Sequence, residues 1–239
     1  MKQVNITLQG KGGIGKSFVS SLIAQNLRDK GEPVICFHTD PINATLSSFK
    51  ALNVHQINLL VDKKINEAAF DEMLEIILSE NSHFVIDNGA ASFVPLSNYL
   101  IQHDALKVIV DAGKQPVIQI VIAGGLALTN TLSDFIQLAE QMSSHAQIVI
   151  WLNEHMGNIL HEGKTFEQSK AYQKYKERVQ AIIRIPRQNE DTFGQTIEQL
   201  ISERLTFTEA LESSTFRIMS KQRLTIYRRG IYEQLALVN

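Results

Sequence analysis

Hydrophobic positions along the chain fall into two kinds of stretch, short continuous apolar runs and longer runs with helical spacing. Continuous runs of about four to eight apolar residues are typical of strands that are buried on both faces. On this basis we expect strands at residues 4–9, 34–37, 57–61, 84–86, 106–110, 118–122, 148–152 and 181–185.

Between these runs, apolar residues recur three or four positions apart, which predicts helices. We expect helices at 16–30, 70–78 and 126–142, and helical structure from 187 to 239. Residues 154–180 are mostly polar and predict a surface loop followed by a charged helix. Because strands alternate with helices, the pattern predicts an α/β fold, a mostly parallel twisted sheet with helices on both faces. We expect residues 1–239 to form a single domain.

The final helical segment carries one apolar stripe with spacings of three and four residues: Leu224, Tyr227, Ile231, Leu235 and Val238. Such a stripe predicts a face that docks on the rest of the domain. Basic residues are spread around the remaining circumference: Arg217, Lys221, Arg223, Arg228 and Arg229. A DNA-contacting surface is therefore a less favoured alternative, and we do not expect stable insertion into a membrane.

Charge and composition narrow the function classes. The chain of 239 residues has 23 Lys and Arg against 25 Asp and Glu, which argues against a generic basic nucleic-acid binder. Its single cysteine, Cys36, excludes a disulfide within the chain and a cysteine-rich metal site from one subunit. The longest mostly apolar run, 117–128, is too short to span a bilayer. The chain begins M-K-Q-V-N-I-T-L and runs directly into a glycine loop, so we expect a soluble cytoplasmic protein without a secretory signal.

Residues 10–17 read G-K-G-G-I-G-K-S and match the P-loop pattern G-x-x-x-x-G-K-[ST]. A predicted strand precedes the match and a predicted helix follows it, as this motif requires. Glycines allow successive backbone N–H groups to close on phosphate oxygens, and the helix N-terminus favours an anion. We expect Lys16 to reach the β- and γ-phosphates of a nucleotide and Ser17 to bind Mg²⁺. The candidate nucleotide-binding residues here are Gly10, Lys11, Gly12, Gly13, Ile14, Gly15, Lys16, Ser17 and Phe18.

Lys11, directly after the first glycine, lies outside the minimal pattern. With it the loop resembles the deviant P-loop, K-G-G-x-G-K-[ST], of the ParA/MinD family of ATPases, which belong to the SIMIBI type of P-loop NTPase. The resemblance implies an ATP-sandwich homodimer in which Lys11 reaches the partner's nucleotide. A lysine that is merely solvated in the loop is the alternative.

Two aspartates extend the resemblance. Asp40, in Thr39-Asp40-Pro41, follows the second predicted strand, where the family orients the attacking water and approaches the Mg²⁺. Asp87 ends the strand at 84–86, as a Walker B aspartate beside the Mg²⁺ would. Plain turn or strand-end roles are the alternatives for both. The family usually has threonine and proline just after the second aspartate, whereas proline comes here only at Pro95.

Two further positions resemble the part of the family's site that holds the base. Asn153 ends the strand at 148–152, where an asparagine pairs with adenine in the family. Pro186 follows Ile185, similar to the turn that borders the base. A strand-end turn is the alternative for Asn153, and a simple strand stop is the alternative for Pro186.

Several segments are most similar to the TraL proteins of conjugative plasmids, among them L-Q-G-K-G-G-I-G-K-S, D-P-I-N-A-T, V-I-D-N-G-A-A-S-F-V-P-L-S and W-L-N-E. This resemblance implies an ATPase accessory to conjugative transfer, with ATP and Mg²⁺ as cofactors and an unidentified protein partner in the transfer machinery. The expected activity is slow ATP hydrolysis by a dimeric switch. The alternatives are a nucleotide-binding scaffold without turnover and a small-molecule ligase or kinase, which would not need Lys11.

Overall fold

The computed structural model describes residues 1–39, 45–61 and 64–238. Within these residues, seven strands form one sheet in the order β11-β8-β7-β1-β6-β2-β3, and every neighbouring pair is parallel. The strands are β1 (Lys2–Thr7), β2 (Val34–His38), β3 (His55–Gln56), β6 (His83–Asp87), β7 (Lys114–Ala123), β8 (Gln147–Asn153) and β11 (Val179–Ile185). The expected α/β fold with a parallel sheet is therefore confirmed.

The helices are α1 (Lys16–Asp29), α2 (Glu67–Ser79), α3 (Phe93–Gln102), α4 (Ala105–Asp111), α5 (Leu128–Gln141), α6 (Lys170–Tyr175), α7 (Gln195–Ser202), α8 (Phe207–Glu212) and α9 (Ile218–Leu235). In the part of the chain that the structure describes, two small two-stranded antiparallel sheets lie outside the main sheet, β4 (Leu60–Val61) with β5 (Lys64–Ile65) and β9 (Leu160–His161) with β10 (Lys164–Thr165). Short 3₁₀ turns and a π-helical turn (Glu190–Gly194) occur between the longer elements.

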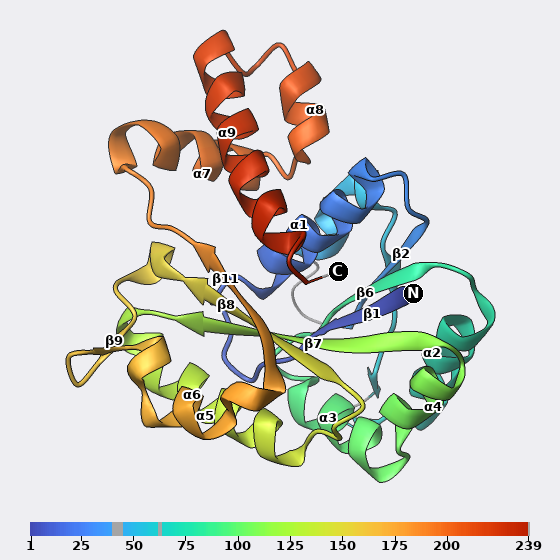
Figure 1. Ribbon diagram of the computed structural model, residues 1–239. Helices are drawn as coiled ribbons and strands as arrows, with labels where there is room; N and C mark the ends of the chain where they lie inside the picture. Colours follow the sequence, from blue (N-terminus) through green and yellow to red (C-terminus); the bar gives the residue numbers. More distant parts are fainter. Residues whose placement is uncertain (40–44, 62–63, 239) are drawn as a thin grey trace.

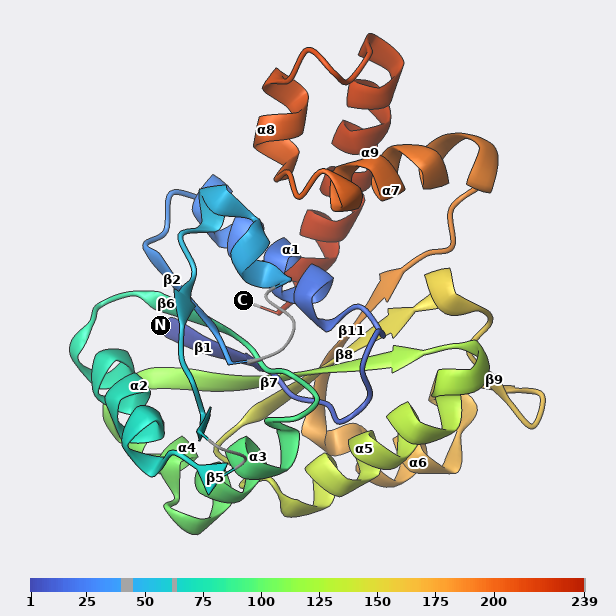
Figure 2. The same cartoon turned by 180° about the vertical axis from the view of Figure 1, so that it is seen from behind.

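Helices cover both faces of the sheet (Figures 1 and 2): α1 and the C-terminal helices α7 to α9 lie on one side, and α2 to α6 lie on the other. Side chains in a strand alternate between faces, so a central strand can contribute to two separate cores. In β7, for example, Ile118, Ile120 and Ile122 face the α2–α6 side, whereas Val117 and Val121 face the α1 side. A sheet buried on both faces explains the continuous apolar runs in the sequence.

A chain of hydrogen bonds between buried polar groups joins three neighbouring strands on the α1 side of the sheet. Gln119 donates from Nε2 to Oδ1 of Asn5 at 2.9 Å, and its own Oε1 accepts from the indole N–H of Trp151 at 2.7 Å. All three residues are buried. Because buried polar groups are costly unless they are paired, these bonds fix the lateral order of β1, β7 and β8.

The expected strand at 106–110 is wrong, because this segment lies in α4. Ala105, Leu106 and Ile109 are buried against the α2–α6 core, at spacings that only a helix can place on one face. The run is short, and periodicity alone cannot separate a buried strand from a buried helix at this length. The expected strand at 57–61 is also largely wrong, since strand structure occurs instead at β3 and β4, and helix α3 was not expected.

The C-terminal apolar stripe is buried on the α1 side, all five members being at most 6% exposed.

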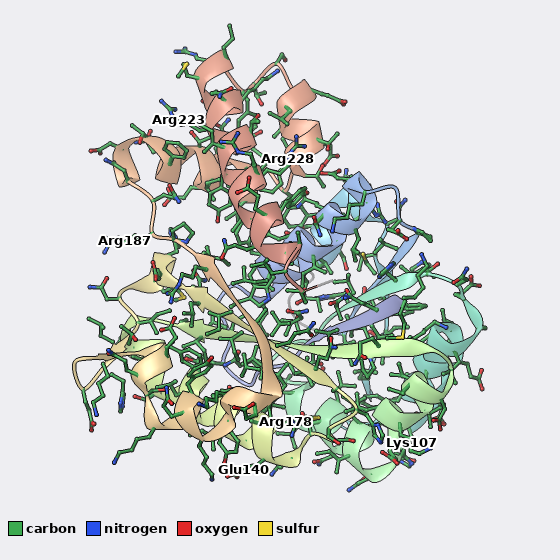
Figure 3. All side chains as sticks on the ribbon, viewed as in Figure 1. Lys107, Glu140, Arg178, Arg187, Arg223 and Arg228 are labelled. Carbon is green, nitrogen blue, oxygen red and sulfur yellow. The ribbon has the colours of Figure 1, made fainter. Side chains whose placement is uncertain are left out.

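The 154–180 segment contains the hairpin β9–β10 and α6, and its residue Arg178 caps the end of another helix. The guanidinium of Arg178 donates to the carbonyls of Ala139, Met142 and Ser143, near the end of α5, where helix carbonyls lack partners. Figure 3 shows Arg178 beneath the sheet, on the opposite side from Arg223 and Arg228 of α9.

Candidate nucleotide site

The register of three parallel strands brings polar residues together at one edge of the sheet. Thr7 at the end of β1 and His38 at the end of β2 both stand beside Asp87 at the end of β6. All three are at most 2% exposed. The carboxyl edge of an open parallel sheet is where such folds bind ligands, so this edge is the place to look for a site.

The P-loop lies between β1 and α1 at the same edge, and its glycines have conformations that other residues rarely adopt. Gly13 has φ of 74° and Gly15 has φ of 98°. A Cβ at Gly15 would also lie 2.7 Å from Nδ2 of Asn153. Backbone conformation and close packing therefore both require glycine at this position.

Helix α1 begins directly after this turn without a side-chain cap, and its first turn holds no acidic residue. The first N–H groups of an α-helix have no partners within the helix, and the helix dipole adds positive potential there. The space beside the Cα atoms of Gly12 and Gly13 is open, because a Cβ atom at either position would meet no other part of the protein within 4 Å. The loop and helix start therefore form a cradle suited to phosphate.

The two lysines of the loop have different environments. Lys16 is only 8% exposed, and its Nζ donates to the carbonyl of Lys11 at 2.7 Å. Lys11 is exposed and does not line the cavity described below. The lysine that every P-loop has is thus folded into its own loop, whereas the additional lysine points its charge toward solvent.

Asp134 of α5 holds the start of the loop. Its Oδ2 accepts from the N–H of Gly10 at 3.1 Å across 124 positions of sequence. Burial raises the pKa of the Asp134 carboxyl, while the N–H groups of Gly10 and Lys11 and the charge of Lys16 act in the opposite direction. Sequence reasoning missed this residue, because nothing in the local pattern of α5 indicates a contact with the P-loop.

A cavity of about 760 Å³ opens over the P-loop. Its lining from the first half of the chain comprises Gly12, Gly13, Gly15, Lys16, Ser17, Phe18, Thr45, Asp87, Asn88, Gly89 and Ala90. Its lining from the second half comprises Asn153, His155, Met156, Ile185, Pro186, Gln188, Gly194, Ile197, Glu198, Ile201 and Tyr227. Polar and glycine-rich segments thus share this cavity with several apolar residues and an aromatic ring, among them side chains of α7 and α9.

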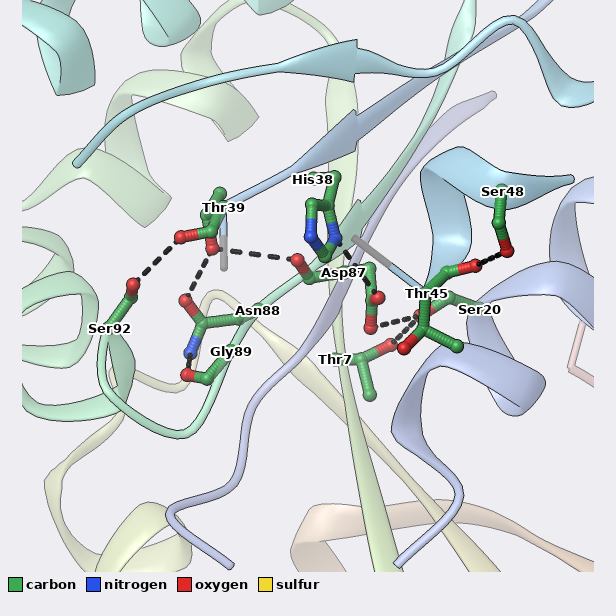
Figure 4. Close-up of polar contacts among 10 residues, drawn as sticks. All are labelled: Thr7, Ser20, His38, Thr39, Thr45, Ser48, Asp87, Asn88, Gly89 and Ser92. Carbon is green, nitrogen blue, oxygen red and sulfur yellow. Dashed lines mark hydrogen bonds and ion pairs between the residues drawn. The ribbon is translucent and has the colours of Figure 1, made fainter. Parts of the chain in front are cut away.

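Figure 4 shows the polar contacts around Asp87. Its Oδ1 accepts from Ser20 Oγ at 3.3 Å, and Ser20 Oγ lies 2.8 Å from Thr7 Oγ1. Its Oδ2 lies 3.3 Å from Nδ1 of His38. Ser20 and His38 are both buried and were not singled out from the sequence, although Ser20 lies one helical turn after Lys16 and His38 directly follows the strand predicted at 34–37.

The end of β2 is tied to the loop that follows β6. Thr39 Oγ1 donates to Oδ1 of Asn88 at 2.8 Å, and Ser92 Oγ donates to the carbonyl of Thr39 at 2.8 Å. Asp40, the predicted catalytic and metal-binding residue after Thr39, lies outside the described residues. These contacts hold Thr39 and the residues that follow Asp87 against each other.

Asn153 contacts the P-loop directly. Its Nδ2 donates to the carbonyl of Ile14 at 2.9 Å, and its Oδ1 accepts from the N–H of His155 at 3.2 Å. The side chain is buried and lies at the cavity wall with Pro186. Asn153 therefore links the end of β8 to the phosphate loop, a contact that the sequence did not suggest, and its contact with a base stays a prediction.

Many of the predicted P-loop, metal and base residues line this one cavity. They are Gly12 and Gly13 together with seven others, Gly15, Lys16, Ser17, Phe18, Asp87, Asn153 and Pro186. Gly10, Lys11 and Ile14 belong to the loop but do not line the cavity. Among the lining residues, the Ser17 hydroxyl and the Asp87 carboxylate are hard oxygen donors of the kind that Mg²⁺ prefers. The residues present therefore fit a Mg²⁺–nucleotide.

A model of the anion-transporting ATPase family matches residues 3–222 of the chain. The chain belongs to this family of P-loop ATPases. Two proteins named TraL from Escherichia coli are 47% and 45% identical to it over 235 residues, which is 98% of this chain and 98% of each relative. The chain is therefore a homologue of TraL over almost its full length, as its segments suggested.

Solved structures support the same fold. The MinC:MinD cell division protein complex of Aquifex aeolicus matches with a TM-score of 0.54 and 14% identity, over 95% of this chain and 94% of that chain. A plasmid partition protein of Borrelia burgdorferi bound to AMPPNP matches with a TM-score of 0.53 and 15% identity, over the whole of both chains. At these identities the likeness shows a MinD/ParA-like P-loop fold.

Among the described residues, no helix is long and apolar enough to cross a membrane.

Proposed function

We propose that the chain binds ATP with Mg²⁺ in this cavity and hydrolyses it slowly, as a cytoplasmic switch whose ATP-bound form is a homodimer. The observation that carries the proposal is that the phosphate cradle, Asp87 and the two base-side residues Asn153 and Pro186 line one cavity. Lys16 and the N–H groups of the helix start would hold the phosphates. Ser17 and Asp87 would hold the Mg²⁺, which supplies charge neutralisation of the phosphates.

The dimer part of the proposal is supported by Lys11. Its exposed side chain stands outside its own cavity while its carbonyl is bound by Lys16. A cation in this position is available to a nucleotide that a second copy of the chain presents. Such a residue acts as an arginine finger does, by stabilising transition-state charge only when the two subunits close.

Gel filtration of the purified chain with ATP, with ADP and without nucleotide tests the switch. We expect a dimer with ATP and a monomer with ADP, and turnover of roughly 10⁻⁴ to 10⁻² per second without a partner protein. Turnover at about 10 per second, typical of metabolic enzymes, would instead favour a small-molecule kinase or ligase. Tight ATP binding without any turnover, even with host extract, would favour a scaffold.

The cellular part of the proposal is an accessory role in conjugative plasmid transfer, supported by the TraL homologues and exercised through a protein partner of the transfer machinery. A mating assay tests it: a host plasmid lacking the gene should transfer less often, and the wild-type chain should restore transfer while Lys16→Ala should not. Pull-down with the ATP-locked dimer, against the ADP form as control, would identify the partner that reads the state.

A further inference from the structure

Asp87 is a buried carboxylate with a contact on each oxygen. Ser20 approaches Oδ1 from α1, and the imidazole of His38 approaches Oδ2 from β2. The side chain of Asp87 is 3% exposed and that of His38 is 1% exposed. Because both side chains are almost fully buried, protein groups make most of the contacts that orient this carboxylate.

The position of His38 follows from the sheet itself. β2 and β6 are parallel neighbours, and their register pairs His38 with Asp87 at the last position of each strand. Thr39 then continues the alignment, since its N–H donates to the carbonyl of Asp87 at 3.1 Å. Backbone bonds on this side therefore fix the two Cα positions, and the imidazole spans the remaining distance.

A carboxylate that binds Mg²⁺, directly or through a water, must present its oxygens in a defined direction, because Mg²⁺ demands near-octahedral geometry. Groups that hydrogen-bond a ligating side chain orient it, and their loss typically weakens metal binding about 10- to 100-fold. Ser20 Oγ makes such a hydrogen bond to Oδ1, and Nδ1 of His38 lies 3.3 Å from Oδ2, within ion-pair distance of it.

We propose that His38 is a positioning residue, which orients Asp87 through Nδ1 so that this carboxylate can serve the Mg²⁺ of the bound nucleotide. The inference rests on the proposed nucleotide-binding function and adds a residue to it. His38 touches neither the nucleotide nor the metal in this role, and it acts only through Asp87.

Two isosteric variants separate the two nitrogens of the ring. The amide of asparagine puts Nδ2 at the place of Nδ1, whereas the longer glutamine puts its Nε2 at the place of the imidazole Nε2. The full-length chain is titrated with Mg²⁺ in the presence of a fluorescent ATP analogue. We expect His38→Asn to reach half-saturation near the wild-type Mg²⁺ concentration and His38→Gln to need about 10-fold more or higher. Binding of the analogue in EDTA should be the same for all three.

His83, at the other end of β6, supplies the matched control. It is also a buried histidine, yet it contacts the amino edge of the sheet, where its Nδ1 accepts from the N–H of Gln3. His83→Gln should leave the Mg²⁺ titration unchanged. Thermal unfolding of each variant establishes that it is folded before the titrations are compared.

The outcomes are distinct. If His38→Gln titrates like the wild type, or His38→Asn is as weak as His38→Gln, the positioning role is refuted while the proposed function stands. An equal shift in His83→Gln would show a general effect of destabilisation and would likewise refute it. If the wild type binds no nucleotide with or without Mg²⁺, the proposed function itself fails and the role of His38 falls with it.

Discussion

The two ends of strand β6 differ in how deeply their ionisable side chains are buried. At the amino end, His83 lies 3.6 Å from Glu32, and Glu32 also forms an ion pair with Lys2 at 2.6 Å. The side chain of Glu32 is 41% exposed. At the carboxyl end, Asp87 and His38 face each other at 3.3 Å with almost no exposure. Four positions of one strand separate this partly exposed cluster from the fully buried one.

The difference in burial separates the cluster that the proposed function uses from the one that it does not. An ion pair that water reaches gains little, because solvent screens it and long side chains lose freedom. A buried carboxylate loses its hydration and is tolerated only when protein groups compensate it. Placing Asp87 and its partners inside the sheet edge therefore costs stability, and the cavity beside them is the gain. Substitutions at the carboxyl edge should change nucleotide chemistry, and those at the amino edge should change stability alone.

The largest expected effect concerns Lys11. If it completes the partner's site, Lys11→Ala should lower ATP hydrolysis by a factor on the order of 10³–10⁵ and prevent the closed dimer. ATP binding by the monomer should stay nearly normal, because Lys11 does not line its own cavity. Single-turnover hydrolysis and gel filtration measure the two effects. Lys30→Ala, at an exposed lysine after the other end of α1, is the control and should behave as the wild type.

Mixing the Lys11→Ala chain with a Lys16→Ala chain sharpens this test. In the heterodimer, one subunit keeps an intact cradle and its partner keeps the reaching Lys11. One competent site should therefore survive, and part of the activity should return. If the subunits pair without regaining activity, or if Lys11→Ala alone hydrolyses normally, Lys11 is a surface lysine and the sandwich mechanism is wrong.

Lys16 should give the next largest effect. Its Nζ lies within its own loop, where it donates to the carbonyl of Lys11 at 2.7 Å, next to the phosphate cradle. Each charge-assisted bond lost in Lys16→Ala weakens ATP binding by about 1.5–3 kcal/mol. Calorimetry should therefore show affinity reduced at least about 10-fold. Lys2→Ala, at the amino edge of the same strand–loop–helix unit, should bind ATP like the wild type, and an equal loss in both would contradict the division between the edges.

How far the sequence predicts this molecule depends on whether the signal is local. The P-loop was predictable because its glycines and its lysine lie within eight consecutive residues. The apolar patterns before and after them also predicted the strand and the helix that the motif requires. The segments 106–110 and 118–122 have equally apolar sequences, yet the first is part of α4 and the second is part of β7. Only the pairing partner of a segment decides between these structures, and composition does not reveal it.

The same limit applies within the site. The bond between Gly10 and Asp134 and the bond between Asn153 and Ile14 join residues more than 120 positions apart. Asn153 was predicted from a resemblance as a base-binding residue, while its contact with the loop needed the register of β8 beside β7. The sequence therefore located the chemistry of the site, and the fold supplied the residues that hold it in place.

Asn153 should give a moderate effect. Asn153→Ala removes one hydrogen bond to the P-loop, worth about 1 kcal/mol, so ATP should bind about five times more weakly. Calorimetry with both ATP and GTP separates the two roles. An equal loss for both nucleotides would leave only the support of the loop, whereas a larger loss for ATP would show that the amide also recognises the adenine edge.

The smallest effect is expected at His83 and takes the form of a pH dependence. Burial lowers the pKa of the His83 imidazole, with Lys2 acting in the same direction and Glu32 in the opposite one. As pH falls through about 6.5, the unfolded chain binds a proton at this residue before the folded chain does, so folding stability falls. That loss continues until the pH passes below the lowered pKa of the folded state.

His83→Asn removes the titration but keeps an acceptor for the N–H of Gln3. Between about pH 7.5 and about pH 5.5, the thermal midpoint of the wild type should therefore fall further than that of His83→Asn, while ATP binding at the higher pH is the same for both. Parallel falls in the two midpoints would assign the acid sensitivity to other groups, and weaker ATP binding in His83→Asn would break the separation between the two ends of β6.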